Sequence, residues 1–236
     1  MTPDDRRAEI AANLGRVEER IGAACRGTGR SRAEITLVAV TKTFPASDVG
    51  HLAALGVRDV GENRAADGAE KAATCAAAGV TGVSWHFVGQ LQTNKAAQVA
   101  AYADVVHSVD RARLVGALDR SAGEVGRRLA CLVQVDLSGE PGRGGADPAD
   151  VGPLADAVAT AEHLDLRGVM AVAPLGADPA EAFTRLADVA ADLRTRHPGA
   201  VVVSAGMSGD LEAAIDHGAT HLRVGTALLG SRPSLR

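Results

Sequence analysis

Lys42 is the residue of this chain best suited to amine chemistry. The sequence contains three lysines against twenty-two arginines, and Lys42 directly follows the apolar run Ile-Thr-Leu-Val-Ala-Val-Thr at 35–41. A guanidinium stays protonated and cannot form an imine, whereas a lysine desolvated by apolar neighbours can lose its proton and attack a carbonyl. From this stretch alone, a lysine that extends from a strand end into water is the alternative.

Two short stretches near the C-terminus have the residue types of a phosphate site. The run Gly-Met-Ser-Gly at 206–209 leads into an expected helix, so backbone N–H groups and the Ser208 hydroxyl would point at one spot. Gly225 and Thr226 would add a second pair of donors. A serine N-cap and a tight turn explain the first stretch equally well, and Asp210 must turn its carboxylate away from any phosphate there.

Arg223 precedes Gly225 by two residues, so its side chain can point to the same interior. It could meet an aromatic nitrogen, or it could be an ion-pair residue, and the sequence favours neither. An amine beside a phosphate site suits a phosphorylated aldehyde. The two candidates are a sugar phosphate and pyridoxal 5′-phosphate (PLP).

Alternating segments of two kinds would position these residues. Short β-rich runs lie at 35–42, 58–62, 84–89, 104–109, 130–137, 166–173, 200–205 and 221–225. Ala-rich amphipathic segments lie between them at about 46–55, 64–79, 93–101, 111–126, 148–162, 179–196 and 209–217. This alternation predicts an α/β fold, a (β/α)₈ TIM barrel, with an open doubly wound sheet as the alternative. In a barrel the last strand lies against the first, which would bring Lys42 beside the phosphate site.

An additional helix is expected before the first strand. Thr2 can cap it and Pro3 suits its first turn, while glycines at 27 and 29 end it. Its apolar residues recur at helical spacing and form one stripe to bury, which consists of Ile10, Leu14, Val17 and Ile21.

Composition narrows the class of protein. We expect residues 1–236 to form one domain, because no linker or change of composition interrupts them. The net charge of −4 gives no basis for binding nucleic acid or an anionic membrane. Three cysteines without Cys-x-x-Cys spacing argue against disulfides and metal sites and for a reducing compartment. With no signal peptide and no apolar stretch of ~20 residues, a cytoplasmic protein is expected.

Seven stretches along the whole chain resemble one family. They are Val-Ala-Val-Thr-Lys-Thr (38–43), Gly-Glu-Asn (61–63), Trp-His-Phe-Val-Gly-Gln-Leu-Gln-Thr-Asn-Lys (85–95), His-Ser-Val-Asp (107–110), Arg-Gly-Val-Met-Ala-Val (167–172), Gly-Met-Ser (206–208) and Arg-Val-Gly-Thr-Ala-Leu-Leu-Gly (223–230). In this order they resemble the pyridoxal phosphate homeostasis proteins. That family looks like the N-terminal barrel of alanine racemase without its second domain.

The resemblance implies a role for each residue of the site. Lys42 would hold PLP as a covalent aldimine, and Arg223 would face the pyridine nitrogen. Asn63 and His86 would line the ring pocket, although His86 could instead be a structural histidine. The phosphate would be held by Ser204, Met207, Ser208, Gly225 and Thr226. The chain departs from the family at Arg143, where relatives often carry a lysine.

The resemblance and the residue types favour a carrier over an enzyme. A cationic Arg223 would leave the pyridine nitrogen unprotonated and weaken the electron sink that PLP enzymes use. Alanine racemase compensates with a second base, a tyrosine, whereas Tyr102 is the one tyrosine here and is expected to lie far from the site. No second domain is expected after the last strand. We therefore expect a monomer that holds PLP, exchanges it with apo-forms of PLP-dependent enzymes and lacks robust catalysis of its own. The alternatives are a PLP-dependent amino-acid racemase and a PLP-free aldolase.

Overall fold

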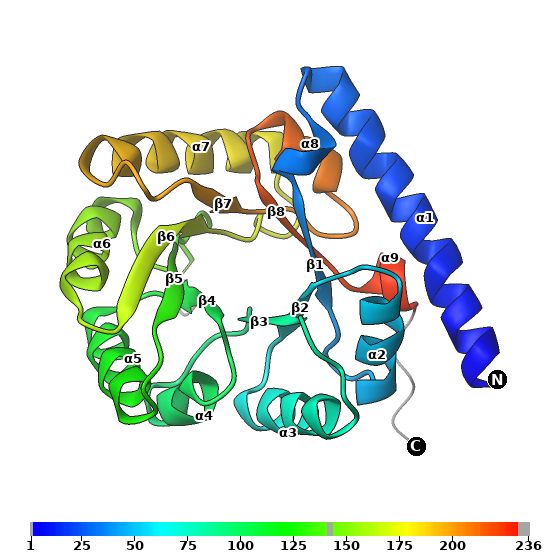
Figure 1. Cartoon of the computed structure of the whole chain (residues 1–236). Helices are drawn as coiled ribbons and strands as arrows, with labels where there is room; N and C mark the ends of the chain where they lie inside the picture. Colours follow the sequence, from blue (N-terminus) through cyan, green and yellow to red (C-terminus); the bar gives the residue numbers. More distant parts are fainter. Residues whose placement is uncertain (1, 141–143, 231–236) are drawn as a thin grey trace.

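Eight parallel strands close into a barrel in the computed structural model, which describes residues 2–140 and 144–230 (Figure 1). The strands are β1 (Thr36–Val40), β2 (Asp59–Glu62), β3 (Ser84–Phe87), β4 (Val105–Val109), β5 (Leu129–Gln134), β6 (Leu164–Met170), β7 (Val202–Ser204) and β8 (His221–Val224). Each pairs in parallel with its neighbours in the chain, and β8 pairs with β1. The predicted barrel is therefore confirmed and the open sheet is wrong. Arg143 lies outside the described residues.

Helices surround this barrel on the outside (Figure 1). They are α2 (Ala46–Ala54), α3 (Ala65–Ala77), α4 (Ala96–Ala100), α5 (Ala112–Glu124), α6 (Val151–Thr160), α7 (Pro179–Arg196), α8 (Leu211–Asp216) and α9 (Thr226–Leu229), with short 3₁₀ turns η1 (Arg32–Glu34), η2 (Thr93–Lys95) and η3 (Pro148–Asp150). Each strand overlaps one predicted run, since residues buried on both faces read as short apolar stretches. The last helical turn, α9, was not predicted, and α8 begins two residues later than expected.

The additional N-terminal helix, α1 (Pro3–Thr28), lies outside the ring of helices and packs on α8 and α9 (Figure 1). Thr2 and Asp5 form a reciprocal capping box at its start, and Gly29 ends it with φ +70°, a left-handed conformation that glycine adopts without strain. The buried stripe differs slightly from the prediction. Cys25 is buried at its end, whereas Leu14 is half-buried at the edge of the core.

The layer between the barrel and the surrounding helices is aliphatic, whereas the barrel interior also holds polar side chains such as His86, His107 and Ser204. Phe87 and Phe183 are the largest of the fully buried side chains, and most others are Leu, Val, Ile and Ala. Cys25, Cys75 and Cys131 are all buried and free. Across residues 2–140 and 144–230, the helices are too short or too polar to cross a lipid bilayer.

Candidate functional site

A pocket of about 460 Å³ opens at the carboxyl end of the barrel strands. Seven of the nine predicted site residues line it, and these are Lys42, Asn63, Met207, Ser208, Arg223, Gly225 and Thr226. They follow or belong to β1, β2, β7 and β8. The other two, Ser204 and His86, do not line the pocket and are buried inside the barrel. Loops that are far apart in the sequence thus contribute to one cavity, as expected for the carboxyl face of this fold.

Barrel closure brings Lys42 and the end of β8 to the same place. Ala39 of β1 is in register with Val224 of β8, so both strands deliver their next residues to the pocket. Lys42 is half-buried at this edge. The following residue, Thr43, has φ +69°, which is rare for a β-branched residue. Such backbone strain is found most often at functional sites.

A buried ion pair supports the end of β1. Lys71, on α3, donates to the backbone oxygen of Thr41 and pairs with the carboxylate of Glu62. Thr41 also donates its hydroxyl to Glu62, whose side chain is only 1% exposed. These contacts tie β1, β2 and α3 together directly before Lys42. This role of Lys71 was not predicted, although a lysine in an arginine-rich chain and the acid in Gly-Glu-Asn could have indicated it.

The loops after β7 and β8 are joined by a hydrogen bond. The backbone N–H of Ala227 donates to the hydroxyl of Ser208 at 3.2 Å. The N–H of Met207, which was expected to face the phosphate, instead donates to the carboxylate of Asp210. Asp210 therefore turns its charge onto its own loop, and the Met207 N–H is engaged there.

Arg223 forms part of the pocket wall and is 5% exposed. Its Nη1 donates to Ser204 Oγ at 2.7 Å, and its Nη2 donates to the backbone oxygen of Ala171 at 2.9 Å. Both of these acceptors are neutral. Burial lowers the pKa of Arg223 to about 10, although attraction by Asp210 raises it. The guanidinium therefore remains a cation at neutral pH.

Ser204 and His86 belong to a layer below the pocket. Ser204 is fully buried, and its hydroxyl contacts Arg223 and His107. His86 is 2% exposed and bonds His107 and Asp59. Neither side chain lines the pocket, and both point into the barrel, so the phosphate role implied for Ser204 and the ring-pocket role implied for His86 stay predictions.

Further pocket residues were not predicted. They are Val40, Phe44, Val88, Gly89, Val172, Gly209 and Gly230. Gly89 allows a close approach of two loops, because a Cβ there would lie 2.2 Å from the backbone oxygen of Asn63. Val88, Gly89 and Val172 lie within two residues after a strand, and this position is the one sequence feature that could have identified them.

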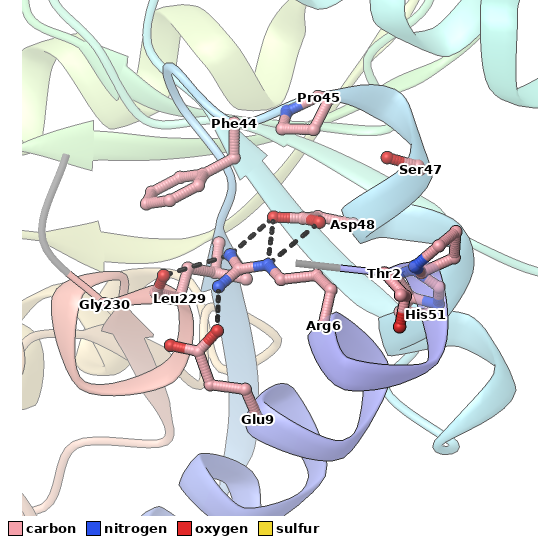
Figure 2. Close-up of a pocket in the computed structure, with 11 residues that line it drawn as sticks. Thr2, Arg6, Glu9, Phe44, Pro45, Ser47, Asp48, His51, Leu229 and Gly230 are labelled. Atoms are coloured by element: carbon pink, nitrogen blue, oxygen red, sulfur yellow. Dashed lines mark hydrogen bonds and ion pairs between the residues drawn. The ribbon is translucent and has the colours of Figure 1, made fainter. Parts of the chain in front are cut away.

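A second hollow, of about 560 Å³, shares Phe44 and Gly230 with the first pocket and is drawn in Figure 2. Figure 2 shows Arg6 of α1 pointing at the carboxylate of Asp48 on α2, with an N–O distance of 2.6 Å. Arg6 also donates to the backbone oxygen of Leu229 on α9, and its Cζ lies 5.5 Å from the centre of the Phe44 ring. The N-terminal helix is thus anchored beside a residue that both hollows share.

The fold and the pocket define a class of protein, the alanine racemase N-terminal barrels. The model of the alanine racemase N-terminal domain family matches residues 10–233. Within that class, the chain belongs to the family of pyridoxal phosphate homeostasis proteins. It is 44% identical to the protein of that name from Mycobacterium bovis over 244 residues, covering 97% of this chain and 95% of the relative. It is 40% identical to the one from Escherichia coli strain K12, covering 95% and 97%.

A solved structure supports the same family assignment. PipY from Synechococcus elongatus PCC7942, solved with PLP bound, superposes with a TM-score of 0.81 at 34% identity. The match covers 94% of this chain and all of PipY. Alanine racemase from Corynebacterium glutamicum is 18% identical with a TM-score of 0.71, which shows a shared fold.

Proposed function

We propose that this protein binds PLP in the pocket, holds it as a Schiff base on Lys42 and exchanges it with other proteins in PLP homeostasis. The observation that carries the proposal is the lining of one pocket by a lysine amine, a buried guanidinium and the hydroxyls of the last two loops. The likeness to PipY, which was solved with PLP bound, supports it.

The donors of the pocket fit the three functional parts of PLP. The Ser208 hydroxyl accepts a hydrogen bond from Ala227, so its own proton is left for a phosphate oxygen. Thr226 adds a second hydroxyl. The amine of Lys42 suits the aldehyde that PLP supplies when bound, and the cationic Arg223 suits the pyridine nitrogen as a hydrogen-bond acceptor.

The same residues favour storage over turnover. Arg223 cannot supply the proton that strengthens the electron sink of PLP at the pyridine nitrogen. Tyr102 packs edge-on against Trp85 and does not line the pocket. Burial raises the pKa of Tyr102, so its phenol is a poor base. We therefore propose a carrier without robust catalysis of its own. A racemase is not favoured, since the curated relatives are named homeostasis proteins.

Exposed apolar residues near the pocket support exchange by contact with other proteins. Val172 and Met207 line the pocket and are 40% and 39% exposed, and Leu175, three residues beyond Val172, is 90% exposed. We propose apo-forms of PLP-dependent enzymes as the partners. In this proposal the protein is a cytoplasmic monomer, and residues 1–236 are a single PLP-binding domain.

Borohydride reduction of the protein mixed with PLP, followed by peptide mapping, tests the Schiff base directly. We expect the pyridoxyl adduct on Lys42 and an absorption band of the internal aldimine that Lys42→Ala removes. Lys95→Ala is the matched control, because Lys95 is exposed and outside the pocket. An adduct confined to Lys71 or Lys95 would contradict the assignment, and rapid interconversion of D- and L-amino acids would favour the racemase.

A further inference from the structure

Four polar side chains form a connected line through the barrel interior beneath the pocket. They come from β2, β3, β4 and β7, and the last of them contacts Arg223 on β8. Their members are Asp59, His86, His107 and Ser204, and we call them the interior relay. Burying polar groups in a barrel core is costly unless each finds a partner, so this line calls for an explanation.

Each link of the interior relay has the length of a good hydrogen bond. Asp59 Oδ1 lies 2.9 Å from His86 Nε2, and His86 Nδ1 lies 2.8 Å from His107 Nε2. His107 Nδ1 lies 2.9 Å from Ser204 Oγ, which accepts from Arg223 Nη1 at 2.7 Å. Both ring nitrogens of each histidine are used. The line begins at the amino end of β2, where Asp59 is 29% exposed, and ends at the pocket wall.

The chemistry at the two ends sets one direction for all four bonds. A carboxylate only accepts, so His86 must place its proton on Nε2, toward Asp59. At the other end, Ser204 accepts from Arg223, so its own proton goes to Nδ1 of His107. A neutral His107 then carries its proton on Nε2 and donates it to Nδ1 of His86. The lone pairs of Ser204 are left to face Arg223, which only donates.

The state of His107 agrees with this direction. Burial first, and then repulsion by His86, Arg223 and His221, lower the pKa of His107 well below its ordinary value. The ring is therefore neutral at physiological pH and carries one proton. With the opposite tautomers, the lone pair of His86 Nε2 would face a carboxylate, which is unfavourable.

We propose that the interior relay positions the guanidinium of Arg223 against the pocket. Because Ser204 gives its proton to His107, its oxygen presents lone pairs to Arg223 and holds that side chain in one orientation. Asp59, His86 and His107 act through Ser204 and touch neither the pocket nor its ligand, so they are positioning residues. The consequence for PLP rests on the proposed function, whereas the orientation of Arg223 does not.

Nitrogen NMR of the ligand-free protein, labelled in histidine and arginine side chains, tests the relay without PLP. We expect His86 and His107 to carry their protons on Nε2 and the Nη signals of Arg223 to be resolved. In His107→Leu, Ser204 has no acceptor for its proton on that side, so its oxygen no longer holds Arg223 in one orientation. We expect the separate Nη signals of Arg223 to merge into one averaged signal. His107→Asn should restore them, since its amide oxygen can replace the Nδ1 acceptor. A proton on Nδ1 of His107, or Arg223 signals unchanged in His107→Leu, would overturn the relay.

Asp59→Ala provides a second test from the partly exposed end, where a failure to fold is less of a concern. We expect His86 and His107 each to populate both neutral tautomers in this variant, instead of one. Asp165→Asn is the matched control, because Asp165 also lies near the amino end of its strand but pairs with Arg128. Unchanged tautomers in Asp59→Ala would contradict a direction set by the carboxylate.

PLP titration separates this inference from the proposed function. If both hold, His107→Leu binds PLP about tenfold more weakly than the parent, the loss expected from one impaired hydrogen bond to a charged group. His107→Asn should recover most of that affinity. An affinity in His107→Leu equal to that of the parent would overturn the positioning role. A parent that binds no PLP would refute the proposed function, and the NMR signals would still decide the relay.

Discussion

Each of the three lysines occupies a different physical setting. Lys42 is half-buried in the pocket, Lys71 is 9% exposed in a buried ion pair, and Lys95 is exposed. Arginine would fit the buried pair poorly because its planar fork is larger than an ammonium, and at position 42 it could not form the imine that we propose with PLP. The choice of lysine over arginine therefore reflects local chemistry at two positions of three.

Removing the cation of the buried pair should destabilise the protein strongly. In Lys71→Met, the carboxylate of Glu62 stays buried without its cationic partner, which costs about 3–5 kcal/mol. Urea unfolding should show the loss, and the double variant Lys71→Met with Glu62→Gln should recover part of it. Lys95→Met is the control and should be neutral. A Lys71→Met protein as stable as the parent would contradict the structural role of the pair.

His221 should make stability depend on pH in the acidic range. Burial, followed by repulsion from His86, lowers the pKa of His221 from 6.5 to about 4, with Asp59 opposing the shift. Between these values the unfolded state binds the proton more readily, so stability is full above about pH 6.5 and falls as the pH drops toward 4, by about 3 kcal/mol. His221→Gln should flatten this part of a plot of unfolding free energy against pH. An equally steep plot for the variant would contradict the assignment.

At the scale of elements, the N-terminal helix and the first strand–helix unit are coupled through one residue. Arg6 links α1 to α2 and α9, and it lies over the ring of Phe44. Phe44 lines the pocket that also contains Lys42 and is two residues from it. The anchoring of α1 therefore bears on the shape of the pocket, although α1 itself supplies no residue to it.

Arg6→Met should loosen α1 and destabilise the whole protein. It leaves Asp48, which is 2% exposed, without its cation and removes the contact with Leu229, so we expect a loss of about 3 kcal/mol. Hydrogen exchange in α1 should accelerate, and urea unfolding should report the loss. Arg7→Met is the control, because Arg7 is exposed on the same helix. Unaltered exchange in α1 would show that the apolar stripe alone holds the helix.

The order of strands and helices was predictable because each element has its own local pattern. Apolar runs, amphipathic spacing and the caps at Thr2 and Gly29 are encoded within a few residues. The short helix α9 was missed, because four residues are too few to show helical periodicity. Position along a strand, together with the family resemblance, was enough to predict half of the residues that line the pocket.

The interior relay and the engaged N–H of Met207 could not be predicted in the same way. His86 and His107 are adjacent only because β3 and β4 pair in register, and Ser204 reaches them across the barrel. The spacing of residues along the sequence does not indicate which side chains meet across a barrel. Likewise, the sequence indicates that Asp210 is near the 206–209 loop but not which way its carboxylate turns.

At the scale of the whole molecule, the pocket lies over the closure of the barrel. Lys42 follows the first strand, whereas Gly225 and Thr226 follow the last, and these two strands are paired along the register Thr36–Ala39 with His221–Val224. A ligand that contacts both sides bridges segments more than 180 residues apart. Binding should therefore stabilise the fold as a unit and not only the loops that it touches.

PLP should raise the unfolding free energy of the protein, and Lys42→Ala should lose most of that gain. A ligand present at a hundred times its dissociation constant stabilises the folded state by about 2.7 kcal/mol. Thermal unfolding at increasing PLP concentration measures this, and hydrogen exchange should slow in both β1 and β8, because the ligand joins their ends. Pyridoxine 5′-phosphate is the matched control ligand: it keeps the ring and the phosphate but has no aldehyde to react with Lys42. We expect it to give a smaller shift that is equal in the parent and in Lys42→Ala. Equal shifts for both ligands in the parent would mean that the Lys42 amine adds nothing to binding.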